Sequence, residues 1–177
     1  MATSLKARLA ELRDAPAIAE IYNQGIEDRA ATFETEPRTA EAIRELLRTR
    51  AGRCAAVVVE EGPRVLGFAW TSEYRPRSAY AGVAEFAIYV ARGARGHGAG
   101  RLAMGALITE AERRGFWKLV SRIFQENLAS RRLCAALGFR EVGTYRRHGQ
   151  LDGKWMDCVI VERLLGAAAR DEPRLSG

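Results

Sequence analysis

Residues 95–100, RGHGAG, lie between an apolar run and a segment with helical spacing. Glycines let a backbone come close to a bulky anion, and the first amides of a following helix point at that anion without partners in the helix. The helix dipole adds about half a positive charge at the same end. A pyrophosphate is the natural ligand of such a loop, and an ordinary glycine-rich turn is the alternative.

The loop does not fit two other phosphate-binding patterns. It lacks the Gly-Lys-Ser/Thr ending of a P-loop, so the metal-binding hydroxyl of that motif is missing. It also lies too late in the chain to open a dinucleotide-binding fold of the usual pattern. Neither a kinase nor a dehydrogenase is predicted.

Strand and helix patterns surround the loop. Residues 84–90 (AEFAIYV) have the composition of a buried strand, and Met104 and Ile108 follow at helical spacing. Asp14 is a candidate N-cap for a helix that runs to about residue 28, and Thr39 is one for a helix that ends near residue 52. Further strands are predicted at 6–12, 55–60, 65–71, 119–124, 141–150 and 155–164, and a helix at 128–137. The order β-α-α-β-β-β-α-β-α-β-β predicts an α/β fold, a mixed sheet covered by helices on both faces.

Length and composition indicate one globular domain. The chain has 177 residues and a mass of 19.6 kDa, which suits a single core. We expect this domain to cover residues 1–165 and a disordered tail to follow over 166–177, because the tail is small, charged and contains proline. No apolar run approaches the roughly 20 residues that cross a bilayer, and residues 1–12 lack the apolar core of a secretory signal. A cytoplasmic location without membrane contact is therefore predicted.

The net charge of +6 would attract a nucleic acid, a phosphorylated cofactor or an acidic substrate. A solvated surface is the alternative, and scattered arginines without interleaved aromatic residues speak against a nucleic-acid partner. The three cysteines, Cys54, Cys134 and Cys158, are odd in number and far apart, which predicts neither a disulfide framework nor a zinc module. His97 and His148 are isolated, so no metal site is predicted.

Two motifs together resemble the GNAT N-acetyltransferase superfamily. The first is a strand that ends in Ile88-Tyr89-Val90 and is followed by R-x-x-G-x-G, the acetyl-CoA signature of that superfamily. The second is residues 127–139, NLASRRLCAALGF, an Asn-led helix that ends in Leu-Gly-Phe. The resemblance implies the GNAT fold, whose central sheet is mixed and mostly antiparallel, and a single N-acetyltransferase domain that uses acetyl-CoA as co-substrate.

Other segments resemble the phosphinothricin N-acetyltransferases more closely. These segments are residues 33–37 (FETEP), residues 75–80 (RPRSAY) and the strand that carries Glu85, and the similarity runs from about Ala7 to Leu164. The family detoxifies glutamate analogues, so the resemblance implies acetylation of the α-amine of phosphinothricin, methionine sulfoximine or arsinothricin, and hence resistance to them. It also implies a homodimer.

The resemblance assigns a cofactor site residue by residue. Backbone groups of Ile88 and Val90 would pair with the pantetheine arm as an added strand, and Asn127, with help from Ser130, would hydrogen-bond the cofactor near its thiol end. The pyrophosphate would be held by the loop and the first helical turn, which comprise Arg95, Gly96, His97, Gly98, Ala99, Gly100 and Arg101.

Glu85 matches the catalytic glutamate of the family. An α-amine is mostly protonated at neutral pH and only the free amine attacks a thioester, so a general base must take the proton, directly or through water. A solvent-facing glutamate at a strand end is the alternative. The backbone N–H of Val90 is the candidate donor to the developing oxyanion. No cysteine has an evident activating partner in the sequence, which favours direct transfer in a ternary complex.

Arg75 and Arg77 are the candidate substrate-binding arginines, because guanidinium forks match the two anionic groups of a glutamate analogue. Phe33 and Tyr80 are candidates for shaping the pocket. A solvated basic loop and ordinary packing are the respective alternatives. Cys134 departs from the family pattern, which places Tyr or His there to protonate the leaving thiolate. The role could fall to Tyr89 or to a water, and the sequence leaves it open.

Two other functions fit parts of the sequence. Acetylation of a protein N-terminus or of another amine would use the same cofactor motifs. A basic nucleic-acid-binding module would account for the charge but not for those motifs.

Overall fold

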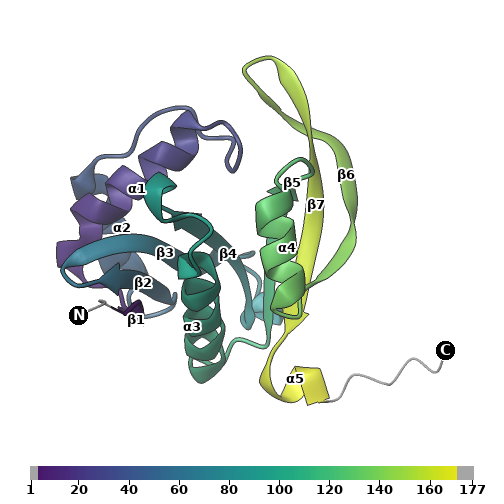
Figure 1. Ribbon diagram of the computed structural model, residues 1–177. Coiled ribbons are helices and arrows are strands. Elements are labelled where there is room, and N and C mark those ends of the chain that lie inside the picture. Colours follow the sequence, from purple (N-terminus) through teal and green to yellow (C-terminus); the bar gives the residue numbers. More distant parts are fainter. Residues whose placement is uncertain (1–3, 171–177) are drawn as a thin grey trace.

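The computed structural model describes residues 4–170, and its centre is one sheet of seven strands in the order β1-β2-β3-β4-β5-β7-β6 (Figure 1). Neighbouring strands run antiparallel except β4 and β5, which are parallel. The strands are β1 Lys6–Leu9, β2 Ala56–Glu61, β3 Arg64–Glu73, β4 Val83–Val90, β5 Lys118–Phe124, β6 Arg140–Leu151 and β7 Lys154–Leu164. The predicted mixed, mostly antiparallel sheet is confirmed.

Helices cover both faces of the sheet, as predicted. The helices are α1 Ala15–Glu27, α2 Ala40–Arg50, α3 Ala99–Arg113, α4 Leu128–Ala136 and α5 Gly166–Arg170. Side chains of α1 and α2 pack with Val58, Phe68 and Trp70 in one core. Side chains of α3 and α4 pack with the opposite face of the sheet, where Phe86 and Leu119 are buried, in a second core.

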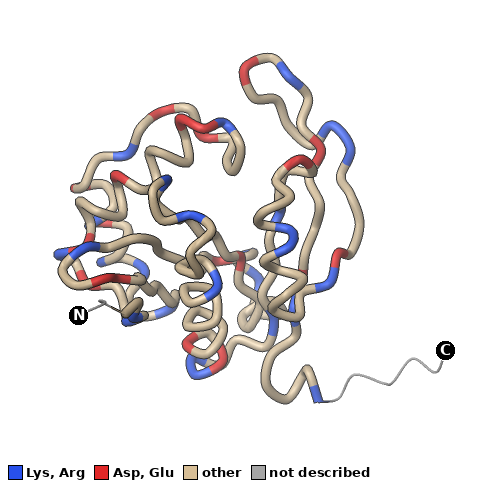
Figure 2. Tube along the Cα trace, in the orientation of Figure 1, with Lys and Arg blue, Asp and Glu red and all other residues tan. Residues whose placement is uncertain are grey.

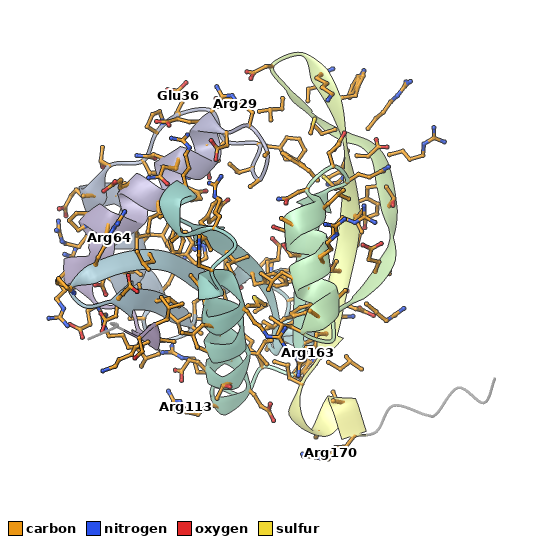
Figure 3. The ribbon with its side chains drawn as sticks, in the orientation of Figure 1. Arg29, Glu36, Arg64, Arg113, Arg163 and Arg170 are labelled. Atoms are coloured by element: carbon orange, nitrogen blue, oxygen red, sulfur yellow. The ribbon has the colours of Figure 1, made fainter. Side chains whose placement is uncertain are left out.

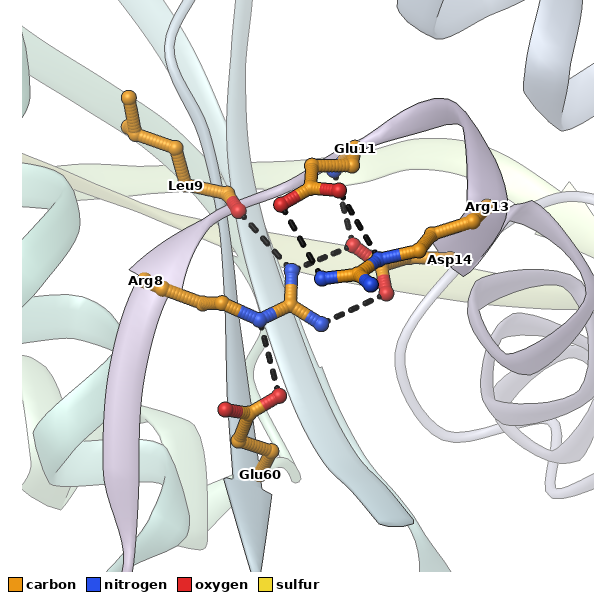
Figure 4. A network of polar contacts seen from close by, with 6 residues as sticks. All are labelled: Arg8, Leu9, Glu11, Arg13, Asp14 and Glu60. Carbon is orange, nitrogen blue, oxygen red and sulfur yellow. Dashed lines mark hydrogen bonds and ion pairs between the residues drawn. The ribbon is translucent and has the colours of Figure 1, made fainter. Parts of the chain in front are cut away.

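The first strand is shorter than predicted. Strand β1 ends at Leu9, and a 3₁₀ turn over Leu12–Asp14 leads into α1. Asp14 stands at the N-cap position, but its carboxylate accepts hydrogen bonds from Arg8 and from the backbone N–H of Glu11, not from the helix (Figure 4). Arg8 also donates to Glu60, so this network ties β1, β2 and the start of α1 together. By contrast, the Thr39 hydroxyl caps α2 as predicted, since it accepts from the N–H of Ala42 at 3.1 Å.

The chain continues in regular structure past the predicted domain end. Residues 166–170 form α5, so the expectation of a disordered tail from 166 onward is wrong for this part, because Gly166 turns the chain at a positive φ and three alanines follow. The rest of that predicted tail, 171–177, lies outside the described residues. Between residues 4 and 170, no helix has the length and apolarity to cross a bilayer.

Charged residues of both signs are interspersed along the fold (Figure 2). Arg64, Arg113 and Arg170 lie well apart around the periphery of the molecule (Figure 3). Many arginines are paired with carboxylates, as Arg92 is with Glu27 and Asp28. This distribution agrees with a solvated surface.

The parallel strands β4 and β5 separate part of the way along the sheet. They pair over Val83–Glu85 and Lys118–Val120 only, whereas β4 stays paired with β3 as far as Val90. Beyond Glu85, the Ser121 hydroxyl donates to the carbonyl of Phe86 at 3.0 Å. The edge of β4 from Phe86 to Val90 therefore faces an opening in the sheet, and this opening positions the site.

Candidate active site

A groove of about 440 Å³ runs along the free edge of β4 to the beginning of α3. Most of the predicted cofactor-binding residues line it: Ile88, Val90, Arg95, Gly96, Gly98, Gly100, Arg101, Asn127 and Ser130. His97 and Ala99 belong to the same loop and helix start but do not line the groove. The structure thus brings together residues from β4, α3 and α4 that the sequence motifs assigned to one ligand.

The loop before α3 presents free amides to this groove. Gly96 and Gly98 have φ of +78° and +90°, a conformation that favours glycine, and Gly98 is the residue at the N-cap of α3. The first amide with a hydrogen bond of the helical pattern is that of Leu102, which donates to the carbonyl of Gly98 at 3.0 Å. The three amides before it, at 99–101, are free to donate to an anion at the positive end of the helix dipole. This donor set fits a pyrophosphate.

Arg95 lines the groove and also makes two contacts within the protein. Its Nε donates to the carbonyl of Val90 at 3.1 Å, and its Nη2 pairs with Asp28 at 2.7 Å. It therefore fastens the loop to the end of β4. Burial would raise the pKa of Asp28, but hydrogen bonds from Arg92 and Arg95 outweigh it and hold that pKa below its ordinary value.

A smaller cavity of about 180 Å³ continues from the groove and contains Glu85. The two share Ala31, Ile88, Tyr89, Asn127 and Ser130. The Glu85 side chain is 29% exposed, and Nη2 of Arg122 lies 3.2 Å from both of its carboxylate oxygens. A carboxylate is thus placed where the sheet opens, next to the end of the groove that Asn127 and Ser130 line.

Tyr89 and Cys134 both line the small cavity. The Tyr89 ring is packed edge-on against Tyr22, with 4.7 Å between ring centroids, and burial raises the pKa of its hydroxyl. Cys134 is buried, which raises the pKa of its thiol to about 12. The thiol is therefore protonated at neutral pH and is no nucleophile.

The four predicted substrate residues do not gather around Glu85 in one chain. Arg75, Arg77 and Tyr80 line a separate cavity of about 540 Å³, which has no residue in common with the Glu85 cavity. Phe33 packs edge-on against Phe124, with 4.8 Å between ring centroids. It thus reaches β5 two residues beyond Arg122.

Two parts of the site are not predicted from the sequence: Arg122, and the groove wall formed by the end of α1 and the loop after it. That wall comprises Gly25, Asp28, Ala30 and Ala31. Tyr89 packs so closely on Gly25 that a Cβ there would lie 2.6 Å from its ring. The only sequence signal for Arg122 is the strand pattern of residues 118–124. That pattern does not show which strand lies next to these residues in the sheet.

This arrangement defines an acyltransferase of the GNAT class, and comparison with known proteins agrees. The model of the acetyltransferase (GNAT) family matches residues 17–139, and the chain belongs to this family. The predicted fold and superfamily are therefore confirmed.

Within the family, the chain is similar to enzymes named for small amino-acid analogues. It is 36% identical to the phosphinothricin N-acetyltransferase of Streptomyces coelicolor, over 86% of this chain and 91% of the relative. It is 30% identical to the L-methionine sulfoximine/L-methionine sulfone acetyltransferase of Pseudomonas aeruginosa, over 90% and 94%. The structure of a phosphinothricin acetyltransferase from Sinorhizobium meliloti in complex with AcCoA superposes with a TM-score of 0.85 at 29% identity, covering 99% of this chain and 95% of that one.

Proposed function

We propose that this protein uses acetyl-CoA to acetylate the α-amine of a small anionic amino-acid analogue of the phosphinothricin, methionine sulfoximine or arsinothricin type, and so confers resistance to it. One observation carries the proposal: a groove with free helix amides at one end leads along an unpaired strand edge to a carboxylate at the other. The names and coverage of the relatives support the substrate class.

The groove fits acetyl-CoA as co-substrate. The amides at 99–101 would hold its pyrophosphate, and the free backbone groups of β4 near Ile88 would pair with the extended pantetheine arm. The N–H of Val90 is the candidate donor to the developing oxyanion, and the carbonyl of the same residue accepts from Arg95. Asn127 accepts from the N–H of Ser130 at 3.2 Å through Oδ1, which leaves its amide NH₂ as a donor near the thioester.

Glu85 acts as the general base. It takes a proton from the substrate ammonium group, directly or through a water in the small cavity, and the free amine then attacks the thioester carbonyl. The acetyl group moves to the amine, and the electron pair of the broken C–S bond leaves with the thiolate of CoA. The nitrogen loses a second proton as the amide forms, and this proton passes to the thiolate or to solvent. A protonated, buried Cys134 supports this direct route over an acyl-enzyme.

Cys134→Ala tests the direct route. We expect the variant to keep most of its kcat, because the thiol neither attacks nor orients a reacting group. Mass spectrometry of the wild-type protein after mixing with acetyl-CoA alone provides the second measurement. Loss of activity in the variant together with acetyl-Cys in the wild type would contradict the direct route.

The substrate assignment is tested with a panel. Phosphinothricin, methionine sulfoximine, arsinothricin and short peptides are compared by kcat/KM, with CoA release followed by a thiol reagent. We expect the highest value for one of the amino-acid analogues. A preference for peptides would favour acetylation of protein N-termini, and no release above background while acetyl-CoA still binds would reject both assignments.

We infer further that the protein works as a homodimer. The hairpin of β6 and β7 exposes Val142, Tyr145 and Trp155 by 48%, 52% and 52%, and β6 is an edge strand. Burial of these side chains against a second copy would remove them from water. Light scattering on the purified protein checks the mass, and a monomer at micromolar concentration would contradict the inference.

A further inference from the structure

Arg122 and Glu85 lie on the same face of the sheet at the point where it opens. Val120 is the register partner of Glu85, and Arg122 follows it by two residues on β5. Side chains alternate along a strand, so Arg122 emerges on the same side as Val120 and one residue pair further into the opening. Both charged groups line the small cavity.

The contact between the two is loose and leaves the guanidinium with spare donors. One nitrogen, Nη2, serves both carboxylate oxygens at 3.2 Å. Arg38, in contrast, donates to the two carboxylate oxygens of Glu34 from two nitrogens, Nε at 2.9 Å and Nη2 at 2.8 Å. Within residues 4–170, Nε and Nη1 of Arg122 have no hydrogen-bond partner, and the side chain is 48% exposed. A guanidinium carries five N–H donors in a planar fork, so Arg122 can bind a second carboxylate without releasing Glu85.

A free α-amino acid is complementary to this pair. Its ammonium and carboxylate groups are attached to the same carbon, so they lie side by side with opposite charges, as Glu85 and Arg122 do. The cavity is also small, at about 180 Å³ against about 440 Å³ for the groove. It suits the head group of an amino acid.

We propose that Arg122 binds the α-carboxylate of the substrate while Glu85 faces its α-ammonium group. The inference rests on the proposed function and sharpens it: the substrate is an amino acid whose α-carboxylate is free. The N-terminal residue of a peptide has an amide at this position and offers no charge to Arg122. The guanidinium thereby selects the substrate and directs the amine to the base.

The first test changes the substrate and leaves the protein intact. The best amino acid of the panel is compared with its α-carboxamide, in kcat/KM and in binding to the CoA-loaded protein by calorimetry. We expect the amide to be worse by about 10- to 100-fold in both measurements, the range for losing a hydrogen bond to a charged group. Equal values for acid and amide would overturn the inference.

The second test changes the protein. Arg122→Gln should raise KM for the acid by about 10- to 100-fold and leave the amide almost unaffected, so that the preference for the acid disappears. Arg122→Lys, which keeps the charge, should restore part of that preference. Arg48→Gln, which removes an exposed arginine paired with Glu45 on α2, is the matched control. An undiminished preference in Arg122→Gln would overturn the inference.

These experiments can tell a failure of the role of Arg122 from a failure of the proposed function. A wild-type protein that acetylates the acid and its amide equally well contradicts the role of Arg122 and leaves the proposed function standing. A wild-type protein that acetylates no amino acid contradicts the proposed function, and the inference with it. If Arg122→Gln folds poorly in a thermal melt, the comparison of acid and amide on the wild type still decides.

Discussion

Among single residues, Glu85 combines a carboxylate with a particular position on its strand. It is the last residue of β4 in the pairing with β5, so its carboxylate stands at the edge of the opening. Two residues further along, the side chain at 87 packs against the core with α1 and α2. One position earlier, Ala84 is fully buried. At this point of the strand, the carboxylate lines the small cavity next to the groove and stays partly exposed to solvent.

Glu85→Gln keeps the shape of the side chain and removes its capacity to accept a proton. We expect kcat to fall by about 10²–10⁴-fold. The affinity for acetyl-CoA should not change, because Glu85 does not line the groove. Steady-state kinetics and calorimetry measure the two effects. Glu45→Gln on α2 is the control and should retain the wild-type rate. A kcat near wild type in Glu85→Gln would show that another group takes the proton.

Part of the site, including Arg122, could not be predicted from the sequence. The motifs that follow one another along the chain, at residues 95–100 and 127–139, could be recognised as they stand. Arg122 belongs to the site only because β5 lies beside β4. Its partner Glu85 is 37 residues away in the sequence. The same limit applies to Arg75 and Arg77, which the sequence predicts as substrate-binding residues but which line a cavity separate from that of Glu85.

At the scale of elements, the start of α3 depends on a glycine. Gly98 has a φ of +90°, and its backbone sets the direction of the amides that follow. Gly98→Ala should destabilise the fold by about 1–2 kcal/mol and raise the Kd for acetyl-CoA. Gly105→Ala in the same helix is the control: a Cβ there meets nothing within 4 Å, so it should stabilise by about 0.5–1 kcal/mol. Chemical unfolding and calorimetry check both. An unchanged Kd in Gly98→Ala would contradict the assignment of these amides.

Elements with strong local signals were predictable almost to the residue. Helix α2 begins after its Thr39 cap, and α4 ends before Gly138, which has a φ of +80°. The length of β1 was not predictable, because the chain leaves the sheet where Asp14 turns back to Arg8. The opening between β4 and β5 was not predictable either, since it depends on which strands are neighbours and on where their hydrogen bonds end.

At the scale of the whole molecule, one carboxylate joins separate parts of the chain. Glu110 on α3 accepts from Arg113 at 2.8 and 2.7 Å and from Arg114 at 2.7 Å. Arg114 also donates to the carbonyls of Ala51 and Cys54, beyond the end of α2. Hydrogen bonds from Arg113, and then from Arg114, outweigh burial and lower the pKa of Glu110 to about 2.

The stability of the protein should therefore fall in acid. The folded-state pKa of Glu110 lies below the value of about 4.3 in an unfolded chain, so its contribution is complete above that value and is lost as the pH falls toward 2. Glu110→Gln should cost about 2 kcal/mol at pH 7 and almost nothing near pH 2. Urea unfolding at both pH values measures this. Glu41→Gln, which removes an exposed pair with Arg44, should cost less than about 1 kcal/mol at either pH. A pH-independent cost of Glu110→Gln would contradict the pKa argument.

The separation of the arginine cavity from the Glu85 cavity is also a property of the whole molecule. In one chain, Arg77 and Glu85 line different cavities, although a two-anion substrate would use both. A homodimer resolves this if the arginines of one protomer complete the pocket of its partner. Because a two-fold axis relates the protomers, each protomer would then supply its arginines to the pocket of the other, and both pockets would be complete.

Mixing two impaired variants tests that exchange. Glu85→Gln should have a low kcat, and Arg77→Ala should have mainly a raised KM. A mixed dimer of the two contains one pocket in which both residues are intact, if they come from different protomers. We expect the mixture to recover activity with a KM near wild type, after the protomers have been allowed to exchange. Mixing Arg77→Ala with the Glu85→Gln/Arg77→Ala double variant is the control, because no pairing there restores a pocket. Activity equal to the sum of the two parents would place both residues' functions within one protomer.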